Sequence, residues 1–173
     1  MNTQKIALGG GCHWCTEAVF QSLMGVERVE QGYVASTGNN NSFSEAVIVH
    51  FNTERISLKT LIEIHLHTHK STSNHSLRKR YRSAIYYYTE KQKLQAIQHL
   101  KALQQGFGEL IITKVLSFSA FKPSRESLHD YYKTNPERPF CKRFIDPKIN
   151  LLLKKYANTL KKNVMERALD AQG

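Results

Sequence analysis

The stretch KIALGGGCHWCTEAVF, residues 5–20, contains three glycines, two of the three cysteines of the chain and its only tryptophan. The apolar residues before the glycines predict a short strand, and the residues after them predict a helix that ends near Gly25. A glycine-rich turn that leads into a helix leaves several backbone N–H groups unpaired next to Cys12. These groups and the helix dipole stabilise a thiolate or another anion at that position. The stretch therefore predicts a strand–turn–helix unit that presents Cys12.

Hydrophobic periodicity predicts further strands and helices along the rest of the chain. The segment SEAVIVHF (44–51) is rich in β-branched residues, which is typical of a strand buried on both faces. A capping box of Thr89 and Gln92 begins the clearest predicted helix, and Ser57 is the expected N-cap of the helix before it. We expect strands at 5–8, 26–35, 44–51, 83–89 and 109–118, and helices at 15–25, 57–67, 89–106 and 124–132.

This order of elements predicts an α+β fold. We expect a single two-layer α/β sandwich, a ferredoxin-like plait, with a mixed sheet. The segment LLLKKYANTLKKNVMER (151–167) repeats apolar residues and lysines at helical spacing, which predicts an amphipathic helix with a solvated basic face. We assign residues 1–156 to one domain and residues 157–173 to a basic helical tail.

The composition indicates a globular protein without a membrane segment. The chain has 173 residues, of which 40% are hydrophobic and 23% charged, and its longest apolar runs are only as long as a strand. The N-terminus lacks the basic start and long apolar region of a signal peptide. Three cysteines are too few for a secreted disulfide scaffold, so we expect a location in the reducing cytoplasm.

The formal net charge of +11 raises the question of nucleic-acid binding. The run RKRYR (78–82) is the most suggestive local feature. No nucleic-acid-binding motif accompanies the charge, and most of the basic residues are spread over predicted helices and the tail. We therefore disfavour a nucleic acid as partner and interpret the charge as a source of solubility and of affinity for acidic partners.

The motif CHWC allows three interpretations. A zinc site needs four ligands, and the remaining candidates are Cys141 and a histidine group in residues 65–75 that lacks the Glu-x-x-His spacing, so we expect no metal. A thioredoxin-type pair would also begin a helix, but the flanking glycines and the predicted strand order argue against it. In the third interpretation Cys12 alone is a nucleophile. Trp14 is then an apolar wall for a small substrate group, although a core position explains this tryptophan equally well.

Several motifs, in the right order, resemble the peptide methionine sulfoxide reductase A family. The segment GGGCHWCTEAVF is similar to the family's Gly-Cys-Phe-Trp motif, and GYVAS to its later Gly-Tyr segment. FSEAVIVHF followed by ISLKTLI resembles the family's Ala-Glu strand and the helix after it. The likeness is strongest at YRSAIYY (81–87), and YYKTNPERPFC (131–141) resembles a segment that carries a recycling cysteine. The resemblance covers about residues 5–155.

This resemblance implies reduction of methionine-S-sulfoxide, free or in peptides, without a cofactor. Cys12 matches the nucleophile, Trp14 the wall of the methyl pocket, and Glu45 the acid that protonates the departing oxygen. Tyr33 and Tyr81 match two tyrosines around that oxygen. Because Glu45 lies in an apolar strand, we expect burial to raise its pKa and keep it protonated.

The resemblance also implies that Cys12 becomes a sulfenic acid, which a second thiol converts into a disulfide. Cys141 matches a recycling cysteine, whereas Cys15 lies one helical turn beyond Cys12 and is its competitor or a relay. A thioredoxin-like dithiol would then reduce the disulfide. We expect a monomer that acts on oxidised methionine in peptides or proteins.

Three departures from the family pattern affect the expected chemistry. His13 replaces a phenylalanine, so the substrate pocket gains a titratable wall. The aspartate expected before Tyr81 is missing, and Ser76 or His75 stands near its place. The family's Glu-x-Tyr-His-Gln segment is matched only loosely, by RESLHDYY (125–132). These departures leave open an alternative: a catalytically impaired or regulatory relative that binds oxidised peptides or senses oxidants through Cys12.

Overall fold

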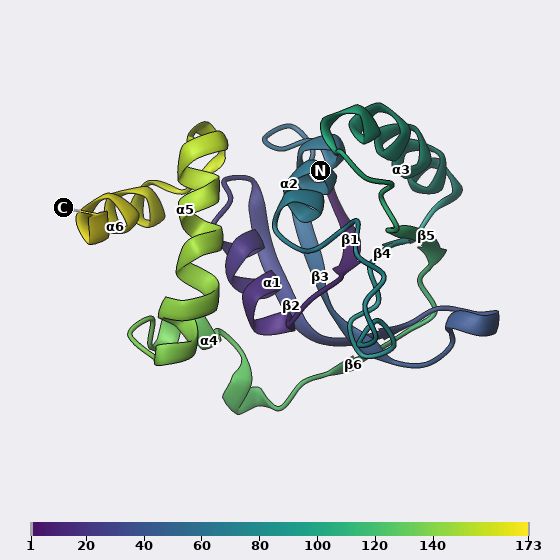
Figure 1. Ribbon diagram of the computed structural model, residues 1–173, viewed down its shortest axis with the longest axis horizontal. Helices are drawn as coiled ribbons and strands as arrows, with labels where there is room; N and C mark the ends of the chain where they lie inside the picture. The colour runs from purple at the N-terminus through teal and green to yellow at the C-terminus, as the bar shows by residue number, and fades with distance from the viewer. Residues whose placement is uncertain (1, 173) are drawn as a thin grey trace.

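A six-stranded sheet runs through the computed structural model, which describes residues 2–172 (Figure 1). The strand order is β5–β4–β1–β3–β2–β6. All neighbouring strands pair antiparallel except β4 and β5, which pair parallel, so the sheet is mixed as predicted. The strands are β1 (Thr3–Gly9), β2 (Val26–Ala35), β3 (Ser44–Asn52), β4 (Ala84–Tyr87), β5 (Lys114–Ser117) and β6 (Ala120–Pro123).

Six α-helices connect or follow these strands in the described part of the chain. Helix α1 links β1 to β2, α2 links β3 to β4, and α3 links β4 to β5. The predicted caps of α2 and α3 are confirmed, because Ser57 accepts a hydrogen bond from the Thr60 N–H and Thr89 accepts one from the Gln92 N–H. The helices are α1 (His13–Gln21), α2 (Leu58–His67), α3 (Glu90–Leu103), α4 (Tyr131–Thr134), α5 (Asp146–Lys155) and α6 (Lys162–Gln172).

Two predicted elements are wrong in extent. The expected helix at 124–132 is a single 3-10 turn, Glu126–Leu128, followed by the short helix α4. Asp130 separates them because its φ of 53° is left-handed, a conformation that no α-helix can continue through. The expected strand at 109–118 is reduced to β5, and β6 forms where we expected none.

The main hydrophobic core lies between one face of the sheet and the helices α1, α2 and α5. Side chains of adjacent strand residues point to opposite faces, so Ile6 and Leu8 of β1 join this core while Ala7 joins a smaller cluster on the other face. Residues 44–49 of β3 are buried on both faces, as predicted. Burial on both faces makes β3 a fixed platform for residues at its ends.

The C-terminal segment docks against the end of α1 and is not one continuous helix. Helix α5 ends at Lys155, a 3-10 turn follows at Ala157–Thr159, and α6 begins at Lys162. The Met24 N–H donates to the Thr159 carbonyl at 2.7 Å, and the Lys161 N–H donates to the Ser22 carbonyl at 2.8 Å. The single amphipathic helix expected at 151–167 is therefore wrong, because the 3-10 turn and the extended residue Leu160, which forms a β-bridge with Leu23, interrupt it.

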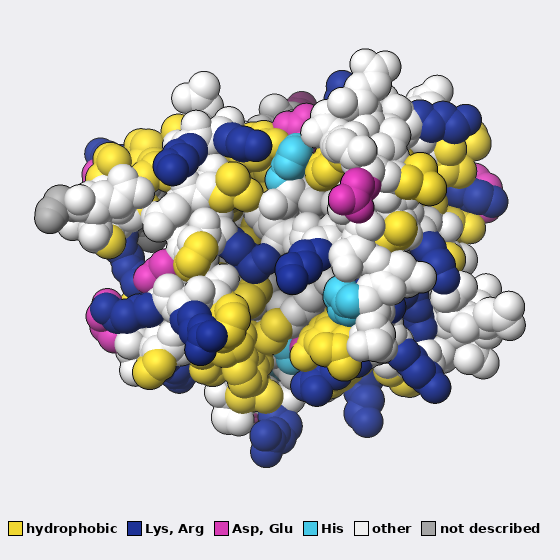
Figure 2. Space-filling view, viewed as in Figure 1, with side chains coloured by type: hydrophobic (Ala, Val, Ile, Leu, Met, Phe, Trp, Pro, Cys, Tyr) yellow, Lys and Arg dark blue, Asp and Glu magenta, His cyan; other side chains and the backbone are white. Residues whose placement is uncertain are grey.

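Lys and Arg side chains are spread widely over the face seen in Figure 2, with fewer acidic side chains between them. This distribution agrees with a solvated basic surface. Among the described residues, no helix is both long enough and apolar enough to cross a membrane.

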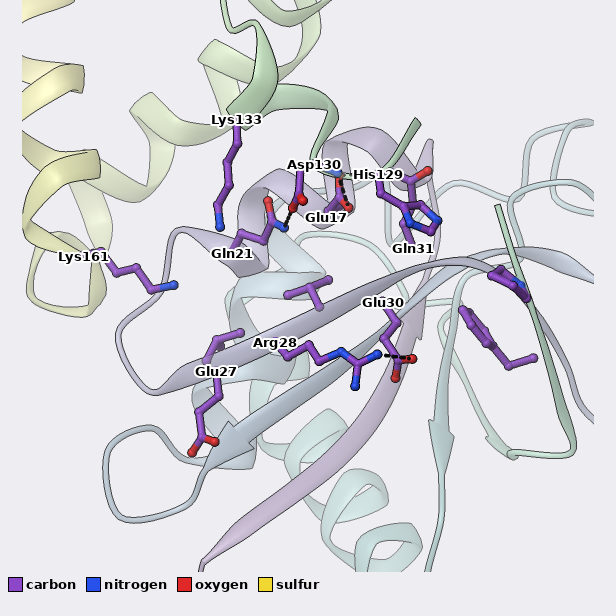
Figure 3. A pocket seen from close by; sticks show the side chains of 14 residues that line it. Glu17, Gln21, Glu27, Arg28, Glu30, Gln31, His129, Asp130, Lys133 and Lys161 are labelled. Carbon is purple, nitrogen blue, oxygen red and sulfur yellow. Dashed lines mark hydrogen bonds and ion pairs between the residues drawn. The ribbon is translucent and has the colours of Figure 1, made fainter. Parts of the chain in front are cut away.

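A polar cavity of about 440 Å³ lies beside α1, between β2 and the residues around α4 (Figure 3). Glu17 and Gln31 form part of its inner wall, and Lys133 and Lys161 extend toward it from the helical side. Its lining contains none of the site residues expected from the sequence.

Glu17 is a buried carboxylate on the wall of this cavity that holds the segment before α4. Its two oxygens accept hydrogen bonds from the Gln31 side-chain amide at 3.0 Å and from the backbone N–H groups of Asp130 and Tyr131 at 3.1 and 3.2 Å. Burial raises the pKa of Glu17, although these three bonds counteract the effect. The carboxylate therefore satisfies backbone groups that the left-handed residue Asp130 would otherwise leave unpaired.

Replacing Glu17 with glutamine should destabilise the protein, because the new NH₂ group cannot accept a hydrogen bond and leaves at least one buried donor unpaired. We expect the free energy of unfolding to fall by about 1–3 kcal/mol in urea titrations at pH 7. The control is Glu54→Gln at an exposed position, which should change this free energy by no more than about 0.5 kcal/mol. Equal stability of wild type and Glu17→Gln would contradict the bracing role.

Candidate active site

The glycine turn between β1 and α1 is held by three side chains from the segment around the end of α2 and the following loop. His65 Nε2 donates to the Gly9 carbonyl at 2.8 Å, and Arg78 Nη1 donates to the Gly10 carbonyl at 2.8 Å. The ring of His69 packs against Gly10 so closely that a Cβ there would lie 2.4 Å from the ring atom Cδ2. Only glycine fits at this position, and the turn is fixed from one side.

The histidines at 65–75 thus have a structural explanation. Burial lowers the pKa of His65 to about 4 and also lowers that of His69, so both rings are neutral at pH 7. His69 Nε2 is 2.7 Å from Ser83 Oγ, and its Nδ1 lies 2.5 Å from the His65 carbonyl. Within residues 2–172, no three His, Cys, Asp or Glu side chains are placed to hold a metal ion.

Cys12 is the N-cap residue of α1 and is half-buried. The pKa of its thiol is lowered, chiefly because the Cys15 side chain donates a hydrogen bond to it. The backbone N–H of Trp14 acts in the same direction, whereas burial and the charge of Glu45 oppose it. The thiol of Cys15 has a raised pKa for the complementary reason. The pair is asymmetric, because Cys12 has the lowered pKa and accepts the hydrogen bond that Cys15 donates.

Glu45 lies near the start of β3 with its carboxylate almost fully buried. Oε1 accepts a hydrogen bond from the His13 backbone N–H at 3.2 Å, and Oε2 accepts one from Arg80 Nε at 2.8 Å. Glu45 therefore does not lie in the purely apolar surroundings that its strand suggested, because a guanidinium group faces it. Glu45 also raises the pKa of Arg80 through the same bond.

Arg80 is a site residue that the sequence reasoning missed. It lies within the basic run at 78–82, which we had interpreted as solvated charge. Its position next to Tyr81, a predicted site residue, is the signal in the sequence that could have identified it. In the structure, the Glu45 N–H donates to the Arg80 carbonyl at 3.0 Å, and this bond joins the loop to β3. Ser76 is exposed, and the ring of His75 accepts from the Leu77 N–H. The side chain facing the buried carboxylate is thus Arg80.

Aromatic rings line the other sides of this cluster. Tyr33 is the direct partner of Glu45 in the β2–β3 register, and its ring lies edge-on to the His13 ring at 5.2 Å. Tyr81 lies under the guanidinium of Arg80 at 5.1 Å, and burial followed by the charge of Glu45 raises its pKa. The structure therefore places Tyr33 against the His13 ring and Tyr81 close enough to Glu45 to be affected by its charge.

Trp14 belongs to an aromatic stack that the sequence did not reveal. Its ring stacks on Tyr131 with centroids 4.2 Å apart and an interplanar angle of 12°, and Phe140 meets it edge-on at 5.1 Å. The guanidinium of Arg138 covers the Tyr131 ring at 4.1 Å. Tyr131 reaches Trp14 because Glu17 holds its backbone N–H, so the cavity wall and the aromatic stack share one support.

The imidazole of His13 is buried between β2 and β3. Nδ1 lies 2.8 Å from the Gly32 carbonyl, and Nε2 lies 3.5 Å from Glu45 Oε1. Gly32 is required there, because a Cβ would lie 2.3 Å from the Lys122 carbonyl of β6. His13 therefore lies beside the Glu45 carboxylate and beside the ring of Trp14.

Cys141 is fully buried at the start of a π-helical turn, Cys141–Ile145. Its thiol donates to the Asn135 carbonyl at 3.6 Å, and burial raises its pKa. It shares the main core with Cys15, and all three cysteines are free thiols. The structure thus places Cys15 next to Cys12 and Cys141 in the core behind them.

Comparisons with known proteins agree with this arrangement. The family model described as Peptide methionine sulfoxide reductase matches residues 4–161. The peptide methionine sulfoxide reductase MsrA of Sulfolobus acidocaldarius is 32% identical over 163 residues, which cover 86% of this chain and 93% of that protein. Among solved structures, Mxr1 from Saccharomyces cerevisiae in reduced form shares the fold with a TM-score of 0.70 at 20% identity, covering 79% of this chain and 87% of Mxr1.

The structure of Mxr1 in complex with Trx2 also matches, with a TM-score of 0.61 at 20% identity over 72% of this chain and 83% of that one. At such identities the two structures show the fold alone. The family match extends over most of the sequence, and its residues include the Cys12 turn, the Glu45 strand and Cys141. On this evidence, the chain belongs to the peptide methionine sulfoxide reductase family.

Proposed function

We propose that this protein reduces methionine-S-sulfoxide, free or within peptides, with Cys12 as the nucleophile. The observation that carries the proposal is the position of a thiol with a lowered pKa at the start of α1, in the same cluster as the buried carboxyl group of Glu45. A nucleophile and a proton donor around one small space are what a sulfoxide requires. Its sulfur is electrophilic, but its oxygen leaves only when it is protonated.

In the reaction, the Cys12 thiolate attacks the sulfoxide sulfur while Glu45 gives a proton to the oxygen. The sulfur–oxygen bond of the substrate breaks and oxygen passes to the Cys12 sulfur, so methionine leaves and Cys12 becomes a sulfenic acid. Tyr33 and Tyr81 hold the oxygen through their hydroxyl groups. Trp14 contacts the methyl group, with its ring held in place by the stack on Tyr131.

We assign recycling to Cys141, with Cys15 as a relay. The Cys15 thiol is already hydrogen-bonded to Cys12, so it can condense with the sulfenic acid to form a disulfide and release water. Cys141 lies in the same core as Cys15 and can then exchange with it, which frees Cys12. A thioredoxin-like dithiol would reduce the last disulfide; the structure of Mxr1 with Trx2 records such a partner for the yeast protein.

We also propose a classification of the fold as a ferredoxin-like plait. The order β4–β1–β3–β2, with α1 after β1 and α2 after β3, supports this class. We assign the reductase domain to residues 1–156 and treat residues 157–173 as an appended basic tail. We expect the protein to act as a monomer in the cytoplasm, where its three free thiols would remain reduced.

The variant Cys12→Ser should lose reduction of methionine-S-sulfoxide with dithiothreitol, because a serine hydroxyl at neutral pH cannot replace the thiolate. We expect a loss of at least about 10³-fold in kcat/KM, as for the loss of a catalytic nucleophile in general. Absence of activity in the wild type would contradict the proposed reductase function and favour the alternative of a catalytically impaired or regulatory protein. Activity in Cys12→Ser would show that another residue is the nucleophile.

The variant Cys141→Ser should retain single-turnover reduction but lose turnover with thioredoxin, because the disulfide cannot pass beyond Cys12 and Cys15. In Cys15→Ser, we expect the sulfenic acid on Cys12 to accumulate and to react with a dimedone probe, since no thiol lies next to it. Mass spectrometry after one turnover measures both states. Full thioredoxin turnover in Cys141→Ser would transfer the recycling role to Cys15.

A further inference from the structure

The imidazole of His13 lies between the Gly32 carbonyl oxygen and Oε1 of Glu45. Of these two oxygen atoms, only the one of the carboxyl group can carry a proton. The Gly32 carbonyl, 2.8 Å from Nδ1, can only accept a hydrogen bond. Nδ1 therefore carries a hydrogen atom permanently, and Nε2 is the only nitrogen of the ring that can gain or lose a proton. This nitrogen lies 3.5 Å from Glu45 Oε1, and both side chains are 5% exposed.

A single exchangeable proton on this pair of atoms has two possible positions. With the proton on Oε1, a neutral carboxylic acid faces the lone pair of Nε2. With the proton on Nε2, an imidazolium faces a carboxylate. Both arrangements satisfy the buried atoms, whereas loss of the proton leaves a carboxylate oxygen facing a nitrogen lone pair away from water, which is unfavourable.

The charged and titratable groups around the pair come from each neighbouring element. Arg80 faces Glu45 Oε2 from the loop before β4, Tyr33 faces the His13 ring from β2, and Cys12 precedes His13 on the glycine turn. Tyr81 lies close enough for the charge of Glu45 to raise its pKa. Among these groups, the guanidinium of Arg80 favours an ionised carboxylate. His13 is the titratable side chain that faces Oε1, the oxygen that Arg80 does not contact.

We propose that His13 is a positioning residue that stores a proton on Nε2 and returns it to Glu45 in each catalytic cycle. The inference rests on the proposed function, in which Glu45 gives one proton to the sulfoxide oxygen. That proton comes from Nε2: it passes to Oε1 and from there to the sulfoxide oxygen, which leaves a neutral imidazole and a carboxylate. Exchange with Cys141 frees Cys12, a dithiol reduces the remaining disulfide, and one of the two protons that the dithiol supplies restores the pair, so the protons balance over the cycle.

The alternative is a purely structural His13 that fills space and bonds to Gly32. The two roles differ in pH dependence, because a shared proton extends the activity of the acid to higher pH. An isolated carboxylic acid loses its proton near pH 4, roughly two pH units below an isolated imidazole. A structural defect lowers the rate by the same factor at every pH.

The experiment compares kcat/KM for free methionine-S-sulfoxide with dithiothreitol between pH 5 and 9. For His13→Phe and His13→Gln we expect the alkaline limb to move at least about one pH unit toward acid, with an activity loss of about tenfold at pH 8. Near pH 5.5 the rates should approach that of wild type. The control is His50→Gln, because His50 forms a comparable pair with Glu30 on the same sheet at 2.7 Å, and its pH profile should match wild type.

A profile of His13→Phe that keeps the wild-type alkaline limb, with a uniformly lower rate, would overturn the proposal. A second measurement is independent of turnover: the titration of His13 followed by nuclear magnetic resonance in wild type and in Glu45→Gln. We expect the midpoint to move toward acid when Glu45 is replaced, because the carboxylate no longer stabilises the second proton. An unchanged midpoint would contradict the proposed proton storage on His13, whether or not the protein reduces a sulfoxide. A shifted midpoint in an inactive protein would contradict only the proposed function.

Discussion

The fixed path of the backbone at Gly9 and Gly10 is the constraint on which the site depends. Two carbonyl groups in succession accept hydrogen bonds from side chains of another segment, His65 and Arg78, instead of from a neighbouring strand. These bonds end β1 and turn the chain into α1 within three residues. Since Cys12 is the N-cap residue, its position relative to the unpaired N–H groups of the helix follows from this turn.

Glu17 and Glu45 are both buried carboxylates, but their hydrogen-bond partners give them different roles. Glu17 accepts three hydrogen bonds from uncharged N–H donors, none of which can exchange a proton with it at neutral pH. Its effect is structural, because it fixes the backbone that carries Tyr131. Glu45 faces Arg80 and His13, a permanent cation and a titratable ring. Glu45 therefore has a titratable ring among its neighbours, whereas the hydrogen-bond donors of Glu17 are all amide groups, although both are acids buried in one small domain.

The sequence sufficed to predict the local elements with strong signals. The apolar run and glycines around Cys12, the β-branched run of β3 and the caps at Ser57 and Thr89 each depend on neighbouring residues, so their patterns are readable in the chain. The family resemblance then placed Glu45 and Tyr81 in the site. The local pattern failed at Asp130, whose left-handed backbone is stabilised by a side chain 113 residues away.

Interactions between segments that are distant in the sequence could not be predicted from local patterns either. The composition of a basic run such as RKRYR does not show which of its arginines bonds to a distant carboxylate; Arg80 does so while its side chain stays 70% exposed. The histidines at 65 and 69 were interpreted as solvated or capping residues, yet they support glycines more than fifty residues earlier. In each case the deciding interaction depends on the packing of the sheet, which no single segment encodes.

The three cysteines illustrate how position differentiates identical side chains. Cys12 accepts a hydrogen bond at a helix start and is half-buried, Cys15 donates that bond from the first turn, and Cys141 bonds to a carbonyl within the core. Because Cys141 is fully buried, no external dithiol can reach it unless the turn at its position moves. That turn begins next to Phe140, which packs against Trp14. Exposure of Cys141, the proposed recycling thiol, would therefore disturb Phe140 and with it the proposed substrate wall at Trp14.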